Sequence, residues 1–255
     1  MQFQCSLNAP PVPENGANVT QSEGSFFALP QPSLPVAGDR RRFPVRRIYC
    51  VGRNYVAHIR EMEEGDERDP PFFFQKPTDA IVTDGAAVPY PQDTDDFQHE
   101  VELVVAIGGG GRNLSREQAL EQVFGYAVGL DMTRRDRQFE ARDMRRPWEM
   151  GKSFDHSAPC GTLRPATEGH VLSGAISVEV NGTPRQTGEL ELMIWNVDEI
   201  IANLSTQYEL KPGDLIFTGT PAGVAAVSPG DQLLARIDGL EDLRVRIDPP
   251  LSQGA

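Results

Sequence analysis

Two acids stand at the start of a long apolar run in Gln98-His99-Glu100-Val101-Glu102-Leu103-Val104-Val105-Ala106-Ile107. On a β-strand, side chains two residues apart point the same way, so Glu100 and Glu102 share one face. Val104 and Ala106 continue that face and apolar residues fill the other, which predicts a strand covered by protein on both sides. Two like charges at the start of such a strand need a counter-ion.

A third acid ends a second apolar run, Gly125-Tyr126-Ala127-Val128-Gly129-Leu130-Asp131. Carboxylates at strand ends indicate a metal ion, and an all-oxygen set suits Mg²⁺, Mn²⁺ or Ca²⁺ rather than zinc. Glu100, Glu102 and Asp131 are therefore the candidate metal ligands. An alternative stays open at this point, because the same acids could pair with arginines or lie in water.

Composition and charge argue against some classes of partner. The chain has 255 residues, enough to bury a sizeable core, with Lys+Arg 24 against Asp+Glu 37 and a net charge of −13. An acidic surface repels nucleic acid and anionic membranes, so neither is expected as a partner. No apolar run reaches the roughly 18 residues of a membrane span, and Met1–Cys5 lacks the basic and apolar regions of a signal peptide. Three widely spaced cysteines without a zinc-binding pattern, Cys5, Cys50 and Cys160, favour the reducing cytoplasm.

The chain is predicted to form an extended arm followed by one folded domain. Residues 1–42 are rich in Pro, Asn, Ser and Gly, which is typical of an arm, and the domain is expected to cover 43–255. Helices are expected to begin near Ser115, in a capping-box pattern, and near Asn196, while Asn181-Gly182 predicts a β-hairpin. Strands are expected at 48–51, 72–74, 100–107, 124–130, 176–180, 215–218, 232–237 and 243–247.

Four further side chains are candidates for chemistry. His58 and Glu61 are one helical turn apart, so they can touch, and a carboxylate beside an imidazole raises its basicity, as activating a water requires. The alternative is an ordinary pair on a helix surface. Lys76 and Lys152 each follow apolar residues and are candidates to face a site, although lysines with a buried stem and a solvated head are commoner.

Taken together, these residues resemble the fumarylacetoacetate hydrolase family over about Phe43 to Ile247. The shared motifs run in the order Val51-Gly52-Arg53-Asn54-Tyr55 with His58 and Glu61, Lys76-Pro77, His99-Glu100-Val101-Glu102-Leu103, Asp131-Met132-Thr133, Lys152-Ser153-Phe154, Pro212-Gly213-Asp214 and Thr218-Gly219-Thr220-Pro221. Two segments, 43–50 and 70–74, look most like the fumarylpyruvate hydrolases of bacterial gentisate breakdown. The resemblance implies an α+β, β-rich fold, a mixed β-sandwich or roll of the C-terminal-domain type, for residues 43–255, and a homodimer.

The resemblance also implies roles for individual residues. It assigns metal ligation, of Mg²⁺ or else Mn²⁺ or Ca²⁺, to Glu100, Glu102 and Asp131, and catalysis to His58, Glu61 and Lys152. The candidate substrate contacts are Arg53, Lys76, Arg135, Gln138 and Thr220. Arg135 is the first candidate to bind the far carboxylate of the substrate and Arg53 the second, with a structural ion pair as the alternative for Arg135.

The expected function is metal-dependent hydrolysis of a carbon–carbon bond in a small-molecule 1,3-diketo acid, with 3-fumarylpyruvate giving fumarate and pyruvate. Glu61 orients His58, which deprotonates the attacking water, and Lys152 with the ion stabilises the departing enolate. Within the family, an acylpyruvate hydrolase, an oxaloacetate decarboxylase or a dienoate isomerase is the alternative. Outside catalysis, the chain could be a β-sandwich that holds structural Ca²⁺, but such a protein needs neither the His58/Glu61 pair nor Lys152.

Overall fold

The structure, a computed structural model, describes residues 26, 28–62, 69–83 and 85–251. The chain divides into two compact units, Met1–Gln31 and Pro32–Ala255, and the second contains the fold analysed below. Most of the predicted arm lies outside the described residues.

The last part of the predicted arm is a β-hairpin that belongs to the second unit. Its strands are β1 Ser33–Val36 and β2 Asp39–Pro44, which pair antiparallel. The alternating pattern buries Leu34 and Val36, and Phe43 joins them in the core. The boundary predicted after residue 42 therefore lies earlier, at Pro32, because the apolar residues of this short Pro-rich stretch pack as a strand pair.

The largest sheet is built around the strand that opened the sequence analysis. Its strands are β3 Arg47–Gly52, β4 Phe72–Lys76, β5 Ile81–Thr83, β8 Val101–Ile107, β9 Val123–Leu130, β11 Ala158–Cys160, β12 Arg164–Pro165 and β15 Asp214–Phe217. The order is β4-β3-β15-β8-β9-β11-β5, with β12 beside β9, and β3/β15 and β5/β11 are parallel pairs. Every residue of β8 is buried, which confirms the predicted strand.

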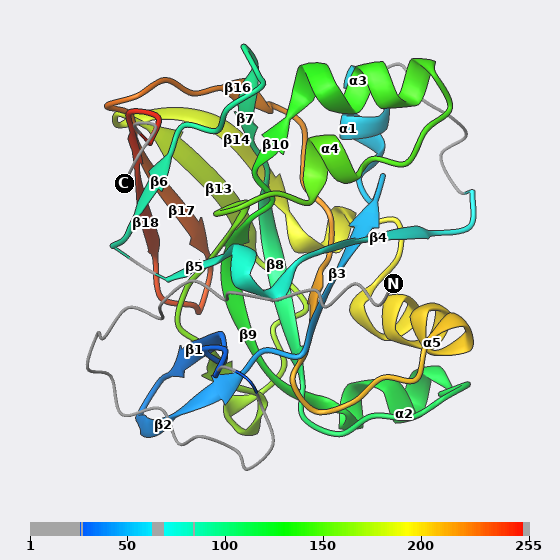
Figure 1. Ribbon diagram of the computed structural model, residues 1–255. Helices are drawn as coiled ribbons and strands as arrows, with labels where there is room; N and C mark the ends of the chain where they lie inside the picture. Colours follow the sequence, from blue (N-terminus) through cyan, green and yellow to red (C-terminus); the bar gives the residue numbers. More distant parts are fainter. Residues whose placement is uncertain (1–25, 27, 63–68, 84, 252–255) are drawn as a thin grey trace, which may run out of the picture. The chain divides into compact units, whose positions relative to one another are not determined.

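A second, five-stranded sheet and a small three-stranded one complete the β-structure (Figure 1). The five-stranded sheet has the order β14-β13-β17-β18-β6 and contains β6 Ala87–Pro89, β13 Ala175–Val180, β14 Thr183–Glu189, β17 Gln232–Ile237 and β18 Leu243–Asp248. The small sheet pairs β7 Phe97–His99 with β10 Thr133–Arg134 and β16 Ala225–Ala226. All eight predicted strands are present, and the β-rich mixed fold is confirmed.

The side chains on the two faces of β8 pack in two separate hydrophobic cores. Val101, Leu103, Val105 and Ile107 pack in the cluster that contains Ile176 and Val178 of the five-stranded sheet. Val104 and Ala106 pack on the other side, with the β1–β2 hairpin. The period of two in the sequence thus divides the interior, and Glu100 and Glu102 stand where the second face begins.

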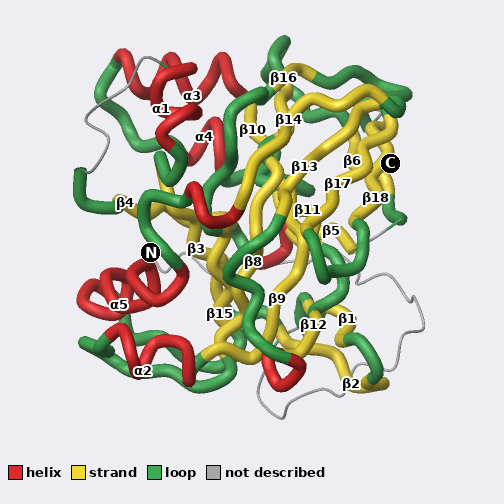
Figure 2. Tube along the Cα trace, turned by 180° about the vertical axis from the view of Figure 1, so that it is seen from behind, coloured by secondary structure: helices red, strands yellow, loops and turns green. Residues whose placement is uncertain are grey.

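Helices are few and short, and they gather in two places (Figure 2). They are α1 Val56–Glu61, α2 Arg116–Glu121, α3 Arg135–Asp143, α4 Glu149–Lys152 and α5 Val197–Gln207, with single 3₁₀ turns at Thr78–Ala80, Ala166–Glu168 and Leu190–Leu192. α2 and α5 lie together, and α1, α3 and α4 lie together at the other end. The capping box at Ser115 and the helix after Asn196 are confirmed. Among the described helices, none has the length and apolar character to cross a membrane.

Two glycines have specific roles in the sheets, one in a turn and one in close packing. Asn181 and Gly182 have φ of 52° and 74°, the left-handed pair that a two-residue hairpin between β13 and β14 requires. Gly129 of β9 lies opposite Glu102 in the ladder, and a Cβ there would lie 2.7 Å from Cε1 of Phe217 and closer still to Val104. The strand pair that carries the acids has no room for a side chain at this point.

Candidate metal and substrate site

Three buried carboxylates meet because β8 and β9 run antiparallel. Glu100 immediately precedes β8 and Asp131 immediately follows β9, so the start of one strand lies beside the end of the other. The Asp131 N–H donates to the Glu100 carbonyl at 2.8 Å. Glu100, Glu102 and Asp131 are 5 %, 1 % and 1 % exposed, and one oxygen of each lies within 4.8 Å of the others.

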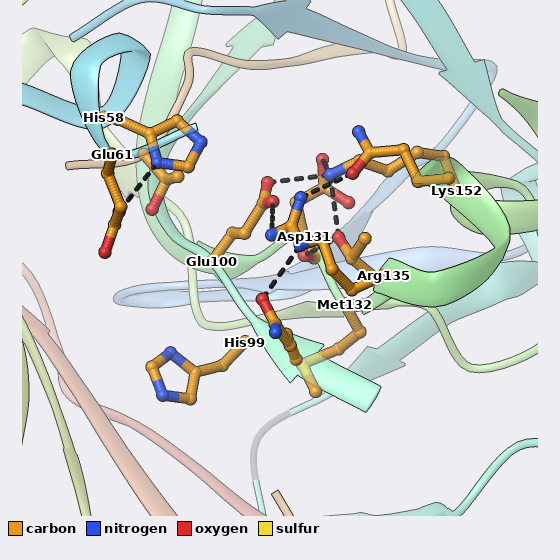
Figure 3. Close-up of polar contacts among 12 residues, drawn as sticks. His58, Glu61, His99, Glu100, Asp131, Met132, Arg135 and Lys152 are labelled. Atoms are coloured by element: carbon orange, nitrogen blue, oxygen red, sulfur yellow. Dashed lines mark hydrogen bonds and ion pairs between the residues drawn. The ribbon is translucent and has the colours of Figure 1, made fainter. Parts of the chain in front are cut away.

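Two of these carboxylates have cationic neighbours (Figure 3). Glu100 lies 2.7 Å from Nζ of Lys152 and 2.5 Å from Nη2 of Arg135. Burial alone raises the pKa of Glu100, but Lys152 and Arg135 outweigh it and hold that pKa below its usual range. Asp131 lies 2.8 Å from Nζ of Lys76 and 2.9 Å from Nζ of Lys152. Glu100 and Asp131 therefore do pair with cationic side chains of the protein, which was the alternative to metal binding left open by the sequence.

Glu102 differs from the other two acids. It accepts a hydrogen bond from the Gly219 N–H at 2.8 Å, but none of the ion pairs among the described residues involves it. Burial raises its pKa, and Asp131 and Glu100 add to the effect, so the pKa lies well above its ordinary value. Three hard oxygen ligands within reach of one another fit a divalent cation such as Mg²⁺, Mn²⁺ or Ca²⁺, and a cation there would favour the ionised form of Glu102.

The two lysines have different places in the site. Lys152, at the end of α4, donates to Glu100, to Asp131 and to Oγ1 of Thr133 at 2.7 Å, and it lines the pocket described below. Burial lowers the pKa of Lys152, but Asp131 and Glu100 outweigh it, so the pKa is raised and the ammonium is charged. Lys76 donates hydrogen bonds to the carbonyls of Met132 and Lys152 and forms an ion pair with Asp131. Lys76 does not line the pocket, so the geometry favours a supporting role over the predicted substrate contact.

The predicted dyad forms on α1. Nδ1 of His58 lies 3.3 Å from Oε2 of Glu61, and both Glu61 oxygens accept from the Gly223 N–H at 3.1 Å. The hydrogen bond from His58 lowers the pKa of Glu61, which keeps the carboxylate ionised. His58 is buried and lines the pocket, whereas Glu61 beside it is exposed and does not line the pocket (Figure 3). Only one member of the pair is therefore a surface residue. Of the acidic stretch that follows the helix, residues 63–68 lie outside the described residues.

One pocket joins these groups. Of the predicted residues it is lined by Arg53, His58, Glu100, Glu102, Asp131, Arg135, Gln138, Lys152 and Thr220. Val51, Ile59, Met62, Phe74 and Trp148 supply apolar walls. The pocket thus has a charged floor and an apolar side, which suits a small anionic organic molecule.

Arg135 is bound to the protein through three of its nitrogens. It is 2 % exposed, and it donates from Nε to Gln98 at 2.8 Å, from Nη1 to Gln138 at 2.5 Å and from Nη2 to Glu100. This geometry favours the structural ion pair over the carboxylate clamp for Arg135. Because the Gln138 oxygen accepts from Arg135, the Gln138 NH₂ group is the end left for the pocket.

Sequence reasoning missed several residues that build the site. Trp148 and Phe74 form its wall, and nothing in their sequence positions indicates this. Asn54 lies within a quoted motif, and its side chain donates to the carbonyls of Trp195 and Thr218 and accepts from the Trp195 N–H. It therefore holds the segment before α1 beside the end of β15. Gln186, on β14, also contacts the site and had no sequence signal.

Comparison with known proteins gives consistent matches. The family model for the fumarylacetoacetate (FAA) hydrolase C-terminal domain matches residues 47–248. A fumarylpyruvate hydrolase from Ralstonia sp. is 47% identical over 178 residues, 70% of this chain and 93% of that protein. The crystal structure of fumarylpyruvate hydrolase from Pseudomonas aeruginosa in complex with Mn²⁺ and pyruvate has 53% identity and a TM-score of 0.86, covering 88% of this chain and 99% of that one. An oxaloacetate tautomerase from Escherichia coli (strain K12) is 38% identical over 199 residues, 77% of this chain and 90% of that protein.

The two glutamates of the site should respond oppositely to neutralisation in metal-free protein. The raised pKa of Glu102 makes its carboxyl a cost to folding that grows as pH rises above the ordinary value of 4.5. The lowered pKa of Glu100 makes its charge stabilising at pH 7, and that contribution is lost as pH falls through its folded-state pKa. At pH 7 in EDTA, Glu102→Gln should raise the melting temperature and Glu100→Gln should lower it, by about 2–4 °C per kcal/mol.

Thermal unfolding with and without Mn²⁺ measures both effects. Wild-type protein should melt higher with Mn²⁺, and Glu102→Gln should lose most of that increase. A lower melting temperature for Glu102→Gln in EDTA would show that its charge is already compensated without an ion.

Proposed function

The chain belongs to the fumarylacetoacetate hydrolase family and is an enzyme of that family, and we propose that it hydrolyses a carbon–carbon bond in a 1,3-diketo acid. The proposed substrate is 3-fumarylpyruvate, which gives fumarate and pyruvate. One observation carries the proposal: a single pocket contains the three carboxylates, Lys152 and a histidine backed by a carboxylate. The similarity to fumarylpyruvate hydrolases from Ralstonia and Pseudomonas supports the choice of substrate.

Glu100, Glu102 and Asp131 would hold a divalent ion, Mg²⁺ or Mn²⁺ in first place. A related enzyme was solved with Mn²⁺ and pyruvate, which supports this choice. When bound, the ion would act as a Lewis acid toward the oxygens of the 2-oxo acid end of the substrate. The neighbouring Lys152 adds a fixed positive charge to the same end of the pocket.

His58 is the proposed general base. Its Nδ1 faces the ionised carboxylate of Glu61, so Nδ1 carries the proton and Nε2 keeps a lone pair. Nε2 would take a proton from water as the water oxygen bonds to the distal carbonyl carbon. The bond between that carbon and the central CH₂ then breaks, and the electron pair leaves on the pyruvyl fragment as an enolate. A proton delivered to the enolate carbon completes pyruvate.

Lys152 would stabilise the departing negative charge. Its ammonium is buried, charged and held in place by Glu100, Asp131 and Thr133, so it needs no reorganisation during the reaction. Gln138 lies on the neighbouring helix α3, and its NH₂ group would donate a hydrogen bond to a substrate oxygen. Thr220, which follows β15 in the chain, also lines the pocket.

The far carboxylate of fumarylpyruvate needs a cation away from this floor. Arg53 lines the pocket, is half-buried, and lies 5.4 Å from the centre of the Phe72 ring. Arg135 instead pairs with Glu100. We therefore place Arg53 before Arg135 as the residue that binds the far carboxylate, which reverses the order expected from the sequence.

A second function is favoured by the oxaloacetate tautomerases that are 38% identical to this chain. Tautomerisation, decarboxylation and dienoate isomerisation move electrons through an enolate but need no attacking water. Activity on oxaloacetate would thus use the acids and Lys152 without the full dyad. The non-catalytic calcium-binding sandwich is not supported, because the family match and the dyad both indicate an enzyme. The homodimer and the cytoplasmic location stay predictions.

Purified protein should release pyruvate from fumarylpyruvate in the presence of Mg²⁺ or Mn²⁺. Loss of the enol absorbance and coupled pyruvate release measure the reaction, with acetylpyruvate and oxaloacetate as comparison substrates. Chelation should abolish turnover, and returning the ion should restore it. Full activity of exhaustively chelated protein would contradict the metal requirement, and turnover of oxaloacetate alone would favour the second function.

The dyad should be needed for hydrolysis more than for enol chemistry. His58→Ala and Glu61→Gln should each depress fumarylpyruvate cleavage by about 10²–10⁴, the usual contribution of a positioned general base, and leave Mn²⁺ affinity intact. Any oxaloacetate activity should fall less. His170→Ala is the control, because His170 contacts Tyr126 outside the pocket. Equal losses on both substrates would mean that the dyad acts mainly by closing the site.

Substitution of Arg53 and of Arg135 should affect the kcat/KM values of two substrates differently. Loss of a charge-assisted contact costs about 1.5–3 kcal/mol, roughly ten- to a hundredfold in kcat/KM. Arg53→Ala should lower kcat/KM for fumarylpyruvate by this factor and for acetylpyruvate, which lacks the far carboxylate, much less. Arg135→Ala should lower both, because it releases Glu100 and Gln138. If Arg135→Ala instead lowers kcat/KM mainly for fumarylpyruvate and Arg53→Ala lowers it for both substrates, Arg135 binds the far carboxylate.

A further inference from the structure

Gln186 is a buried polar side chain on a strand whose other residues are at least partly exposed to solvent. β14 is an edge strand of the five-stranded sheet, and its other residues are exposed or half-buried, whereas Gln186 is 0 % exposed. Burying an amide is unfavourable unless its hydrogen bonds are made. The sequence Thr183 to Glu189 alone gives no reason for a buried glutamine at its centre.

Every hydrogen-bonding position of the Gln186 amide is used. Oε1 accepts from the Val101 N–H at 3.0 Å and faces Nδ1 of His99 at 2.8 Å. Nε2 donates to Oγ1 of Thr220 and to the Pro221 carbonyl, each at 2.7 Å. A backbone N–H can only donate and a carbonyl can only accept, so the amide has one possible orientation. Nδ1 of His99 must therefore carry a proton.

Gln186 thereby fixes the backbone between two of the proposed metal ligands. Val101 stands between Glu100 and Glu102, and its N–H is bound by Gln186. Its carbonyl accepts from Oγ1 of Thr220 at 2.8 Å, and Thr220 is itself bound by Gln186. The three residues close a ring of hydrogen bonds around the point from which both carboxylates project.

The same ring of hydrogen bonds determines whether the hydroxyl of Thr220, which lines the pocket, can donate or accept a further hydrogen bond. The Thr220 hydroxyl gives its only hydrogen to the Val101 carbonyl and uses one lone pair to accept from Gln186. One lone pair remains, so Thr220 can offer the pocket a hydrogen-bond acceptor but no donor. Its partner must then be a group that donates, such as a water or the enol hydroxyl of a diketo acid, rather than a carboxylate or ketone oxygen.

We propose that Gln186 is a positioning residue, which holds the two glutamates of the metal site through Val101 and keeps Thr220 in the pocket as a hydrogen-bond acceptor. The Thr220 part rests on the proposed function, whereas the Val101 part does not depend on the substrate. Outer-shell partners of this kind typically contribute 10–100-fold to metal affinity or activity.

Two substitutions separate the two parts. Gln186→Met keeps the side-chain size and removes all four hydrogen bonds. It should weaken Mn²⁺ binding, measured by titration calorimetry, about tenfold or more, and should speed hydrogen exchange of the Val101 amide. Gln186→Glu retains the acceptor toward Val101 and His99 but removes the donors toward Thr220 and Pro221. It should keep the Val101 amide protected while lowering kcat for fumarylpyruvate.

Ser205→Ala is the matched control for loss of a buried hydrogen-bonding group. Ser205 is 1 % exposed, accepts from the Leu114 N–H at 2.9 Å, and lies outside the pocket. It should lower the melting temperature and leave Mn²⁺ affinity and kcat unchanged. If Gln186→Met behaves in the same way as Ser205→Ala, Gln186 is only a structural residue and the proposal fails.

A double-mutant cycle tests whether Gln186 acts through Thr220. The loss of kcat in Gln186→Glu combined with Thr220→Val should be no greater than in Thr220→Val alone, whereas independent roles would multiply the losses. Thr220→Ser, which keeps the hydroxyl, should recover most of the activity, and this pair stays informative if the Gln186 variants do not fold. Wild-type kcat in Thr220→Val would overturn the Thr220 part. Wild-type protein that binds Mn²⁺ but fails to cleave fumarylpyruvate would overturn the proposed function and leave the Val101 part to be judged by calorimetry and exchange.

Discussion

The burial of three carboxylates in one small volume is the constraint on which the rest of the site depends. Glu100, Glu102 and Asp131 lie almost completely out of water, where like charges repel strongly. Three cations lie beside these acids, Lys152, Lys76 and Arg135. Each is held by hydrogen bonds to the carboxylates or to backbone carbonyls. These cations serve Glu100 and Asp131, and Glu102 is left with a raised pKa. A cation bound beside the three acids would favour the ionised form of Glu102.

This arrangement of charge also explains the division of labour around the pocket. Lys76 supports Asp131 from outside the pocket, whereas Arg135 and Lys152 both line the pocket and are both held by Glu100. The dyad approaches from a different element, α1, whose carboxylate is anchored by the Gly223 N–H. Water activation and charge stabilisation thus come from opposite sides of the carboxylates, as Figure 3 shows. A reaction that needs an attacking water and an enolate leaving group uses both sides.

Hydrogen bonds from two neutral side chains hold the backbone around the site. Gln186 reaches from β14 to Val101 and Thr220, and Asn54 ties the start of α1 to Trp195 and Thr218. Neither residue carries charge, and both satisfy backbone groups that would otherwise be buried without partners. In the proposed role of Gln186, a neutral amide positions the backbone that carries two of the acids, and an amide can be fully satisfied at less desolvation cost than a further ion pair.

The sequence by itself determined the strand-dominated fold, the shared face of Glu100 and Glu102 and the possible contact of His58 with Glu61, because each depends on local spacing, whereas the pairing of β8 with β9 brings Asp131 to them. Alternation in 98–107 fixed which side chains share a face of β8, and the one-turn spacing of His58 and Glu61 allowed contact on α1. Local spacing failed at residues 33–42, where a short Pro-rich stretch packs as a hairpin. Only the tertiary structure decided that Lys76 and Arg135 are held by the protein, that Trp148 forms a wall, and that Gln186 is buried against Val101. These outcomes depend on contacts between segments far apart in the chain, and the charge and size of a side chain do not specify which partner the fold will bring to it.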